Sequence, residues 1–131
     1  MRRIEIGDFL LIAELNCGIA AERLARIPRV IDLAEAALAA PFAKSDGQQT
    51  FPAVPEKAAV YCSRIATYRP LPDGNKRTAY DVMRELLYRN GVPFAHPADG
   101  LEGTARAIED LGAGKRGERE FIAWVLARTS W

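Results

Sequence analysis

The chain has 131 residues and a formal net charge of +1, with 49% hydrophobic and 27% charged residues. These values are ordinary for a soluble globular protein and predict one domain, residues 1–131, around a single core. The near-neutral charge argues against a nucleic-acid partner, and no apolar run is long enough to span a membrane. No signal peptide is visible, and Cys17 and Cys62 lack metal-ligand spacing, so we expect a cytoplasmic protein with reduced thiols.

Helical periodicity accounts for most of the first half of the chain. A short first helix is expected to begin at Asp8, which suits an N-cap, and to end before Gly18. Pro28 suits the first turn of a second helix through about Ala39. A third helix is expected over residues 54–68, where apolar residues recur at helical spacing.

The longest irregular stretch lies between the second and third helices, at residues 41–55. Its Asp46-Gly47 pair favours a tight turn and predicts a small β-hairpin near residues 41–52. The hairpin would join Pro41-Phe42-Ala43 to Thr50-Phe51. A solvated connecting loop is the alternative interpretation.

Three further helices are expected in the second half, over 74–90, near 99–111 and near 116–128. The last of them should turn its apolar residues mostly inward; these are Phe121, Ile122, Trp124, Val125 and Leu126. Trp124 and Trp131 are assigned to packing. Six helices and little strand predict an all-α fold, a compact six-helix bundle.

The central feature of the sequence is the stretch Tyr68-Arg-Pro-Leu-Pro-Asp-Gly-Asn-Lys-Arg-Thr78, a loop that leads straight into a helix. Pro70 and Pro72 keep the loop extended, and Asp73 suits the N-cap of the helix. Lys76 and Arg77 then fall in the first turn, where the helix dipole makes cations unfavourable. A bound anion reverses that effect, because amide donors and both cations can converge on one phosphate.

Each of these residues also has a structural interpretation. Arg77 could pair with Asp81 at the i+4 position, and Lys76 could be a solvated surface lysine. Asn75 could orient the loop or touch a phosphate. Asp73 could be a plain N-cap or could hold a magnesium ion that bridges phosphate oxygens.

The run Asp73-Gly-Asn-Lys-Arg-Thr78 resembles the central motif of the Fic/Doc (Fido) family. The Doc, or death-on-curing, branch carries His-x-Phe-x-Asp-(Ala/Gly)-Asn-Lys-Arg-Thr. Leu71 stands at the phenylalanine position, and Arg69 stands where the family has its catalytic histidine. The resemblance is strongest from about residue 51 to residue 91, and it implies the Fido helical bundle with a flap at residues 41–52 that positions a target segment.

The resemblance implies a toxin that transfers phosphate from ATP, with Mg²⁺, to a threonine or serine of a protein such as elongation factor Tu, arresting translation. It places catalytic roles at Arg69, Asp73, Lys76 and Arg77, nucleotide binding at Gly74, Asn75, Lys76 and Arg77, and the metal on Asp73. Lys76 indicates the Doc branch; AMP transfer is the alternative chemistry. A separate antitoxin is the expected partner, because no self-inhibiting (Ser/Thr)-x-x-x-Glu-(Gly/Asn) sequence is present.

Arg69 is the main departure from the motif. Guanidinium stays protonated at any relevant pH, so Arg69 cannot act as a general base, and we predict impaired catalysis. Either the protein has abandoned catalysis and is a nucleotide-binding pseudoenzyme, or this chain is an inactive variant of a parent with histidine. His96, the sole histidine, is expected to be a solvated loop residue, with a catalytic role as the alternative. A binder of RNA or DNA phosphates is disfavoured by the charge.

Overall fold

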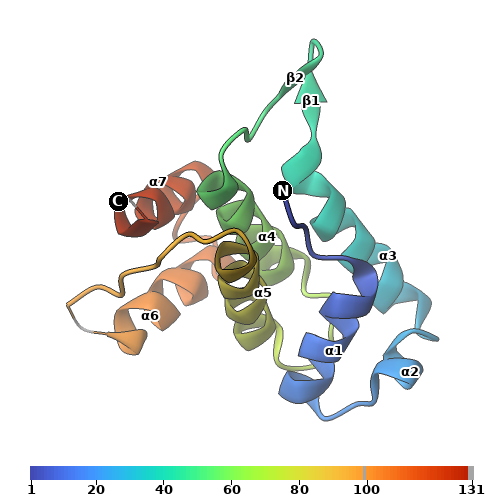
Figure 1. The fold of residues 1–131 in the computed structure, drawn as a ribbon. Coiled ribbons are helices and arrows are strands. Elements are labelled where there is room, and N and C mark those ends of the chain that lie inside the picture. Colours follow the sequence, from blue (N-terminus) through green and yellow to red (C-terminus); the bar gives the residue numbers. More distant parts are fainter. Residues whose placement is uncertain (99, 130–131) are drawn as a thin grey trace.

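The computed structural model describes residues 1–98 and 100–129, and over these residues the fold is all-α with one small hairpin (Figure 1). Helices α4 and α5 lie in the middle, with α1 to α3 on one side and α6 and α7 on the other. In chain order the elements are α1 (Ile6–Cys17), α2 (Ala21–Leu24), α3 (Pro28–Ala39), the 3₁₀ helix η1 (Ala40–Phe42), β1 (Lys44–Ser45), β2 (Gln48–Gln49), α4 (Val54–Tyr68), α5 (Asn75–Arg89), α6 (Leu101–Gly112) and α7 (Glu118–Thr129).

The described part of the chain has seven α-helices instead of the predicted six. The additional one, α2, has four residues, too few for a periodic apolar pattern to be recognised in the sequence. The prediction near 99–111 corresponds to α6, and residue 99 lies outside the described residues, as does Trp131. The predictions for α3 and α4 agree with the observed bounds.

Helix α1 begins two residues earlier than predicted, and Asp8 is not its N-cap. Glu5 is the N-cap residue, and its backbone N–H donates to the Asp8 carboxylate at 2.9 Å. Arg89 at the end of α5 reaches the same carboxylate at 3.2 Å. A hydrogen bond from Arg89 and then that from Glu5 hold the pKa of Asp8 below its usual value. Asp8 therefore joins the start of α1 to the end of α5.

Helix α4 forms the centre of the core. Its buried residues lie on several faces and include Tyr61, Cys62 and Ile65, each with 0% exposure. A helix that is apolar on most sides belongs in the interior, which agrees with the position of α4 in Figure 1. Both cysteines are free, and burial raises the pKa of the Cys62 thiol.

Helix α7 packs on α4 through an ion pair as well as through apolar contacts. Arg64 of α4 donates to both carboxylate oxygens of Glu118, at 2.7 and 3.0 Å. Phe121 and Val125 are fully buried, but Leu126 is 38% exposed, so the predicted apolar side of this helix was too wide. Trp124 stacks on Phe121 with a centroid separation of 5.7 Å.

The predicted hairpin is present and projects away from the helical body (Figure 1). Lys44 pairs with Gln49 and Ser45 with Gln48 in antiparallel register. Asp46 and Gly47 form the turn with φ of 52° and 80°, as a type I′ turn requires. The strands are shorter than predicted, because Pro41 and Phe42 belong to η1. All four strand residues are exposed.

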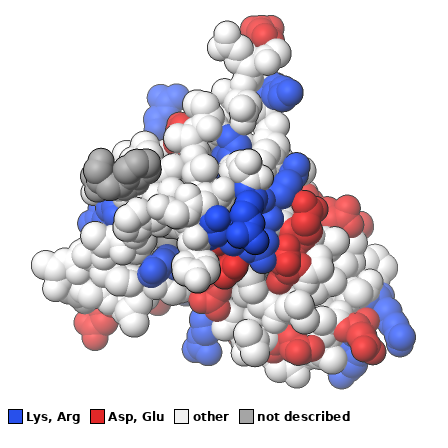
Figure 2. Space-filling view, in the orientation of Figure 1, with Lys and Arg blue, Asp and Glu red and all other residues white. Residues whose placement is uncertain are grey.

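The surface carries charges of both signs. Figure 2 shows acidic side chains directly beside a basic group near the middle of the face in view, so this face has no broad field of one sign. None of the described helices is long and apolar enough to cross a membrane.

Candidate functional site

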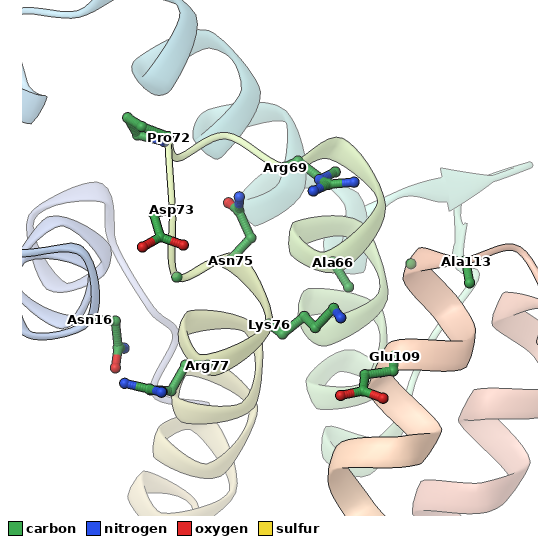
Figure 3. A pocket seen from close by; sticks show the side chains of 12 residues that line it. Asn16, Ala66, Arg69, Pro72, Asp73, Asn75, Lys76, Arg77, Glu109 and Ala113 are labelled. Carbon is green, nitrogen blue, oxygen red and sulfur yellow. The ribbon is translucent and has the colours of Figure 1, made fainter.

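A cavity of about 540 Å³ opens at the N-terminal end of α5, where the central sequence motif lies. Figure 3 shows the side chains around it. The motif supplies most of the lining, and α1, α4 and α6 supply the remainder. The lining residues are Asn16, Ala66, Arg69, Pro72, Asp73, Gly74, Asn75, Lys76, Arg77, Glu109, Gly112 and Ala113. The fold therefore brings every predicted site residue to one cavity.

The loop between α4 and α5 is fixed by the side chain of Asn75. Its amide nitrogen donates to the Leu71 carbonyl at 2.8 Å, and its amide oxygen accepts from the Leu71 N–H at 2.9 Å. Leu71 is itself buried, with 3% exposure. Of the two roles considered for Asn75, the structure contains the loop-orienting one, and both polar ends of the side chain are already engaged.

Gly74, and not Asp73, occupies the N-cap position of α5. Gly74 has φ of 77°, and its carbonyl accepts the N–H of Thr78 at 2.9 Å. The prediction for Asp73 was wrong because the chain makes a left-handed turn at Gly74 before the helix starts, which glycine permits. A Cβ at this position would lie 2.6 Å from the backbone oxygen of Asn16. The contact with α1 therefore also requires glycine.

This start leaves the first turn of α5 without a side-chain cap. Its free N–H groups and its positive dipole end are available to an anion. Asp73 is not the N-cap residue, and its exposed carboxylate lies at the edge of the same cavity. A carboxylate beside a phosphate site is the arrangement that suits Mg²⁺. The described residues contain no cluster of three or more metal-ligating side chains, so phosphate oxygens and water would have to complete the shell.

Lys76 and Arg77 are both exposed, and no ion pair within residues 1–98 and 100–129 involves either of them. The alternative pairing of Arg77 with Asp81 is not formed. Asp81 instead accepts a hydrogen bond from the side-chain amide of Asn16 at 2.9 Å. Figure 3 shows Lys76 extending toward α4 and α6, and Arg77 toward Asn16. The two cations line one cavity but point to different parts of it.

Arg69 ends α4 in a left-handed conformation with φ of 52°. Its N–H donates to the Ile65 carbonyl at 3.1 Å, and its carbonyl accepts from the guanidinium of Arg29 at 3.0 Å. Side chains other than glycine, asparagine, aspartate and histidine rarely adopt this conformation. The backbone at Arg69 is therefore held by its neighbours, and its exposed side chain borders the cavity.

Three residues of the site were not found from the sequence. Asn16 of α1 donates to the Thr78 hydroxyl at 3.3 Å, and Arg29 of α3 donates to the Arg69 carbonyl. Glu109 of α6 adds a second carboxylate, which Figure 3 shows opposite Lys76. Each lies far from the motif in the chain, and no local pattern marks it. Only the packing of the helices brings these residues to the site.

A second cavity, of about 510 Å³, shares Lys76, Arg77 and Glu109 with the first. Its remaining lining is largely apolar and comes from α5 and α6: Tyr80, Asp81, Leu101, Thr104, Ala105 and Ile108. The first turn of α5 therefore lies between a polar cavity and a more apolar one.

His96 lines neither cavity. Its Nε2 lies 3.2 Å from the guanidinium of Arg84, and its Nδ1 lies 3.2 Å from the hydroxyl of Thr104. Because an arginine can only donate, Nε2 is the acceptor and Nδ1 carries the proton toward Thr104. Burial and then the charge of Arg84 lower the pKa of His96. His96 is an exposed loop residue, as expected, and its ring also joins this loop to α5 and α6.

A sequence model of the Fic/DOC family matches residues 8–87. The match covers more than half of the chain and contains the whole motif, so the chain belongs to the Fic/DOC family. A protein named Toxin Doc from Mycolicibacterium smegmatis is 39% identical over 67 residues. That alignment covers 51% of this chain and 52% of the relative, so the chain spans about half the length of that protein.

Proposed function

We propose that this protein is a Doc-type toxin and that its motif cavity binds ATP with Mg²⁺. In the active form the γ-phosphate passes to a threonine or serine hydroxyl of a protein, such as elongation factor Tu, and translation stops. The observation that carries the proposal is the first turn of α5, which has no side-chain cap and has two cations beside a cavity that form no ion pair within the described residues. Such a turn is unfavourable without an anion and favourable with one.

The parts of the cavity suit the parts of a nucleotide. The charge of a phosphate chain would be neutralised by Lys76, Arg77 and the free N–H groups of the first turn. This electrostatic stabilisation accounts for most of the catalysis in phosphoryl transfer. Asp73 would hold Mg²⁺, whose chemistry is to neutralise charge on bridging phosphate oxygens. The adjoining cavity offers Tyr80, Leu101 and Ile108 as apolar surface for the nucleoside.

The hairpin suits the protein substrate. Its two short strands are exposed and project from the body, so an extended segment can pair with their edges through main-chain hydrogen bonds. Holding the hydroxyl in this way would place it in line with the phosphate, and correct placement lowers the barrier without further chemistry.

The chain as written lacks a base, because Arg69 cannot accept the proton of the hydroxyl. We therefore propose that it binds nucleotide with impaired transfer and that Arg69→His activates it. AMP transfer is the second chemistry, and Lys76 in the motif favours phosphate over it by resemblance to the Doc branch. A nucleotide-binding pseudoenzyme is the alternative that Arg69 itself favours. The proposed partner that controls the active form is a separate antitoxin.

The test is the intact mass of purified elongation factor Tu, and of proteins in a lysate, after incubation with ATP, Mg²⁺ and the Arg69→His protein. A gain of one phosphate is expected, and a gain of one AMP would show the second chemistry. The unmodified protein and the double variant Arg69→His, Arg77→Ala are the controls. A histidine variant that binds ATP without modifying any protein would favour the pseudoenzyme.

Growth gives an independent test in cells. Expression of the Arg69→His protein alone should arrest growth, and co-expression of a small neighbouring gene should relieve the arrest. Harmless expression of the folded histidine variant would contradict the toxin assignment.

A further inference from the structure

One buried cation, the ammonium of Lys57, lies at the base of the hairpin. Lys57 of α4 is only 3% exposed, yet no ion pair within the described residues involves it. It also lies in the first turns of α4, where a positive charge opposes the helix dipole. A buried charge in such a place is costly unless its hydrogen bonds are satisfied, so its contacts should explain why it is there.

The contacts of Lys57 are all at the base of the hairpin. Its ammonium donates to the side-chain oxygen of Gln49 at 2.7 Å, to the carbonyl of Phe51, and to the carbonyl of Pro52 at 3.3 Å. Three donors thus meet three acceptors, all on β2 or the loop that follows it. Burial lowers the pKa of Lys57, with the charge of Glu56 acting in the opposite direction.

The same ammonium also lies near η1, which precedes the first strand of the hairpin. Its Nζ lies 5.6 Å from the centre of the Phe42 ring, and the guanidinium of Arg3 lies over that ring at 3.9 Å. A cation over an aromatic face is attracted by the ring. Lys57 therefore lies at both sides of the hairpin base, near Phe42 before the first strand and bonded to Gln49 and Phe51 in and after the second.

Among the described residues, the side-chain hydrogen bonds that join residues 44–52 to a helix all come from Lys57. A two-stranded hairpin alone is marginally stable in water, and all its strand residues are exposed. We infer that Lys57 is a positioning residue, which fixes the direction of the hairpin and, under the proposed function, of a substrate segment that pairs with it. The positioning of a substrate rests on the proposed function; the anchoring of the hairpin does not.

The anchor is tested by hydrogen exchange at the Thr50 amide, which donates to the Ala43 carbonyl at 3.0 Å across the hairpin base. Lys57→Met should speed this exchange by about tenfold or more, because it removes hydrogen bonds from a charged donor. Amides in the middle of α5 should keep their rates, and Lys44→Met, at an exposed hairpin lysine, should change Thr50 little. Gln49→Ala removes one acceptor without touching the core and should give a smaller effect in the same direction. Unchanged Thr50 exchange in both Lys57→Met and Gln49→Ala would overturn the anchor.

The positioning role is tested in the Arg69→His protein. Lys57→Met should raise KM for the protein substrate and leave kcat and KM for ATP unchanged. Equal changes in both KM values would overturn positioning, since a general loss of structure affects both substrates. If the Arg69→His protein itself transfers nothing, the proposed function fails, and Thr50 exchange still decides whether Lys57 anchors the hairpin.

Discussion

Two sets of cations in this protein differ in their surroundings. Arg64 donates to both oxygens of Glu118, and Arg89 pairs with Glu85 at 2.8 Å and with Asp8 at 3.2 Å. The hydrogen bond to Glu118 is the main reason that the pKa of Arg64 lies above its usual value. These arginines join helices that are distant in the chain.

The motif cations have no such arrangement. Arg69, Lys76 and Arg77 line one cavity, and no ion pair of the described residues includes them. The two carboxylates of the cavity, Asp73 and Glu109, are also outside the ion pairs of that part of the chain. Among the described residues, Arg64 and Arg89 are thus paired where they join helices, whereas the cations of the motif cavity are in none of the ion pairs. The variants below test that division.

The largest effect on stability is expected for Gly74→Ala. A side chain in the left-handed conformation and a contact at 2.6 Å with the Asn16 backbone oxygen should together lower the free energy of unfolding by about 2–4 kcal/mol. Gly91→Ala is the matched control, since Gly91 has φ of 69° with open space around its Cβ position. Urea unfolding should show a smaller loss in the control, and equal losses would mean that the approach of α1 to the motif is unimportant.

Arg64→Met should follow, because it leaves the Glu118 carboxylate without its cation and with only the Ser63 hydroxyl as a donor. The pair is partly exposed, with side-chain exposures of 30% and 27%. We expect a loss of about 1–3 kcal/mol in urea unfolding. Arg119→Met, on the exposed side of the same end of α7, is the control and should change stability by less than about 0.5 kcal/mol. Similar losses of unfolding free energy in Arg64→Met and Arg119→Met would show that the ion pair of Arg64 does not stabilise the fold.

Acid should weaken the paired set. Burial raises the pKa of Glu118, but hydrogen bonds from Arg64 and Ser63 outweigh it, and the pKa is lowered overall. A carboxylate with a lowered pKa binds fewer protons when folded, so its stabilisation is present above the ordinary glutamate value of about 4.3 and is lost as the pH falls through the folded pKa. Urea midpoints between pH 7 and pH 3 should fall less steeply in Glu118→Gln. If the urea midpoints of the parent and of Glu118→Gln fall in parallel with pH, Glu118 contributes nothing to the acid sensitivity.

The smallest effect on stability is expected for Arg77→Ala. Removing a cation from the first turn of a helix should change the free energy of unfolding by less than about 0.5 kcal/mol, with a gain as the expected sign. Binding of ATP–Mg, measured by calorimetry, should weaken by about tenfold or more, since a guanidinium contact to phosphate is lost. Lys115→Ala, outside both cavities, is the control for both measurements. A stable Arg77→Ala protein that binds as tightly as its parent would contradict the anion site.

Local patterns were enough to predict much of the fold. Proline at the start of α3 and the helical spacing of apolar residues in α4 predicted both helices, and Asp46-Gly47 located the hairpin turn. The start of α5 was misplaced, because a left-handed glycine and an aspartate N-cap leave the same sequence signal at Asp73-Gly74. Asn16 and Glu109 were missed because their roles depend on how α1 and α6 pack against the motif, which no neighbouring residue encodes.

The conformation of Arg69 has a consequence for how this site can change. Its left-handed backbone is one that histidine adopts several-fold more readily than most residues. Engineering of active sites usually meets a trade-off, in which changes that improve activity cost stability. At this position the two requirements agree, because the substitution proposed to supply a base also relieves the backbone. Arg69→His should therefore leave the melting temperature unchanged or raise it, and selection for activity here meets no opposing selection for stability.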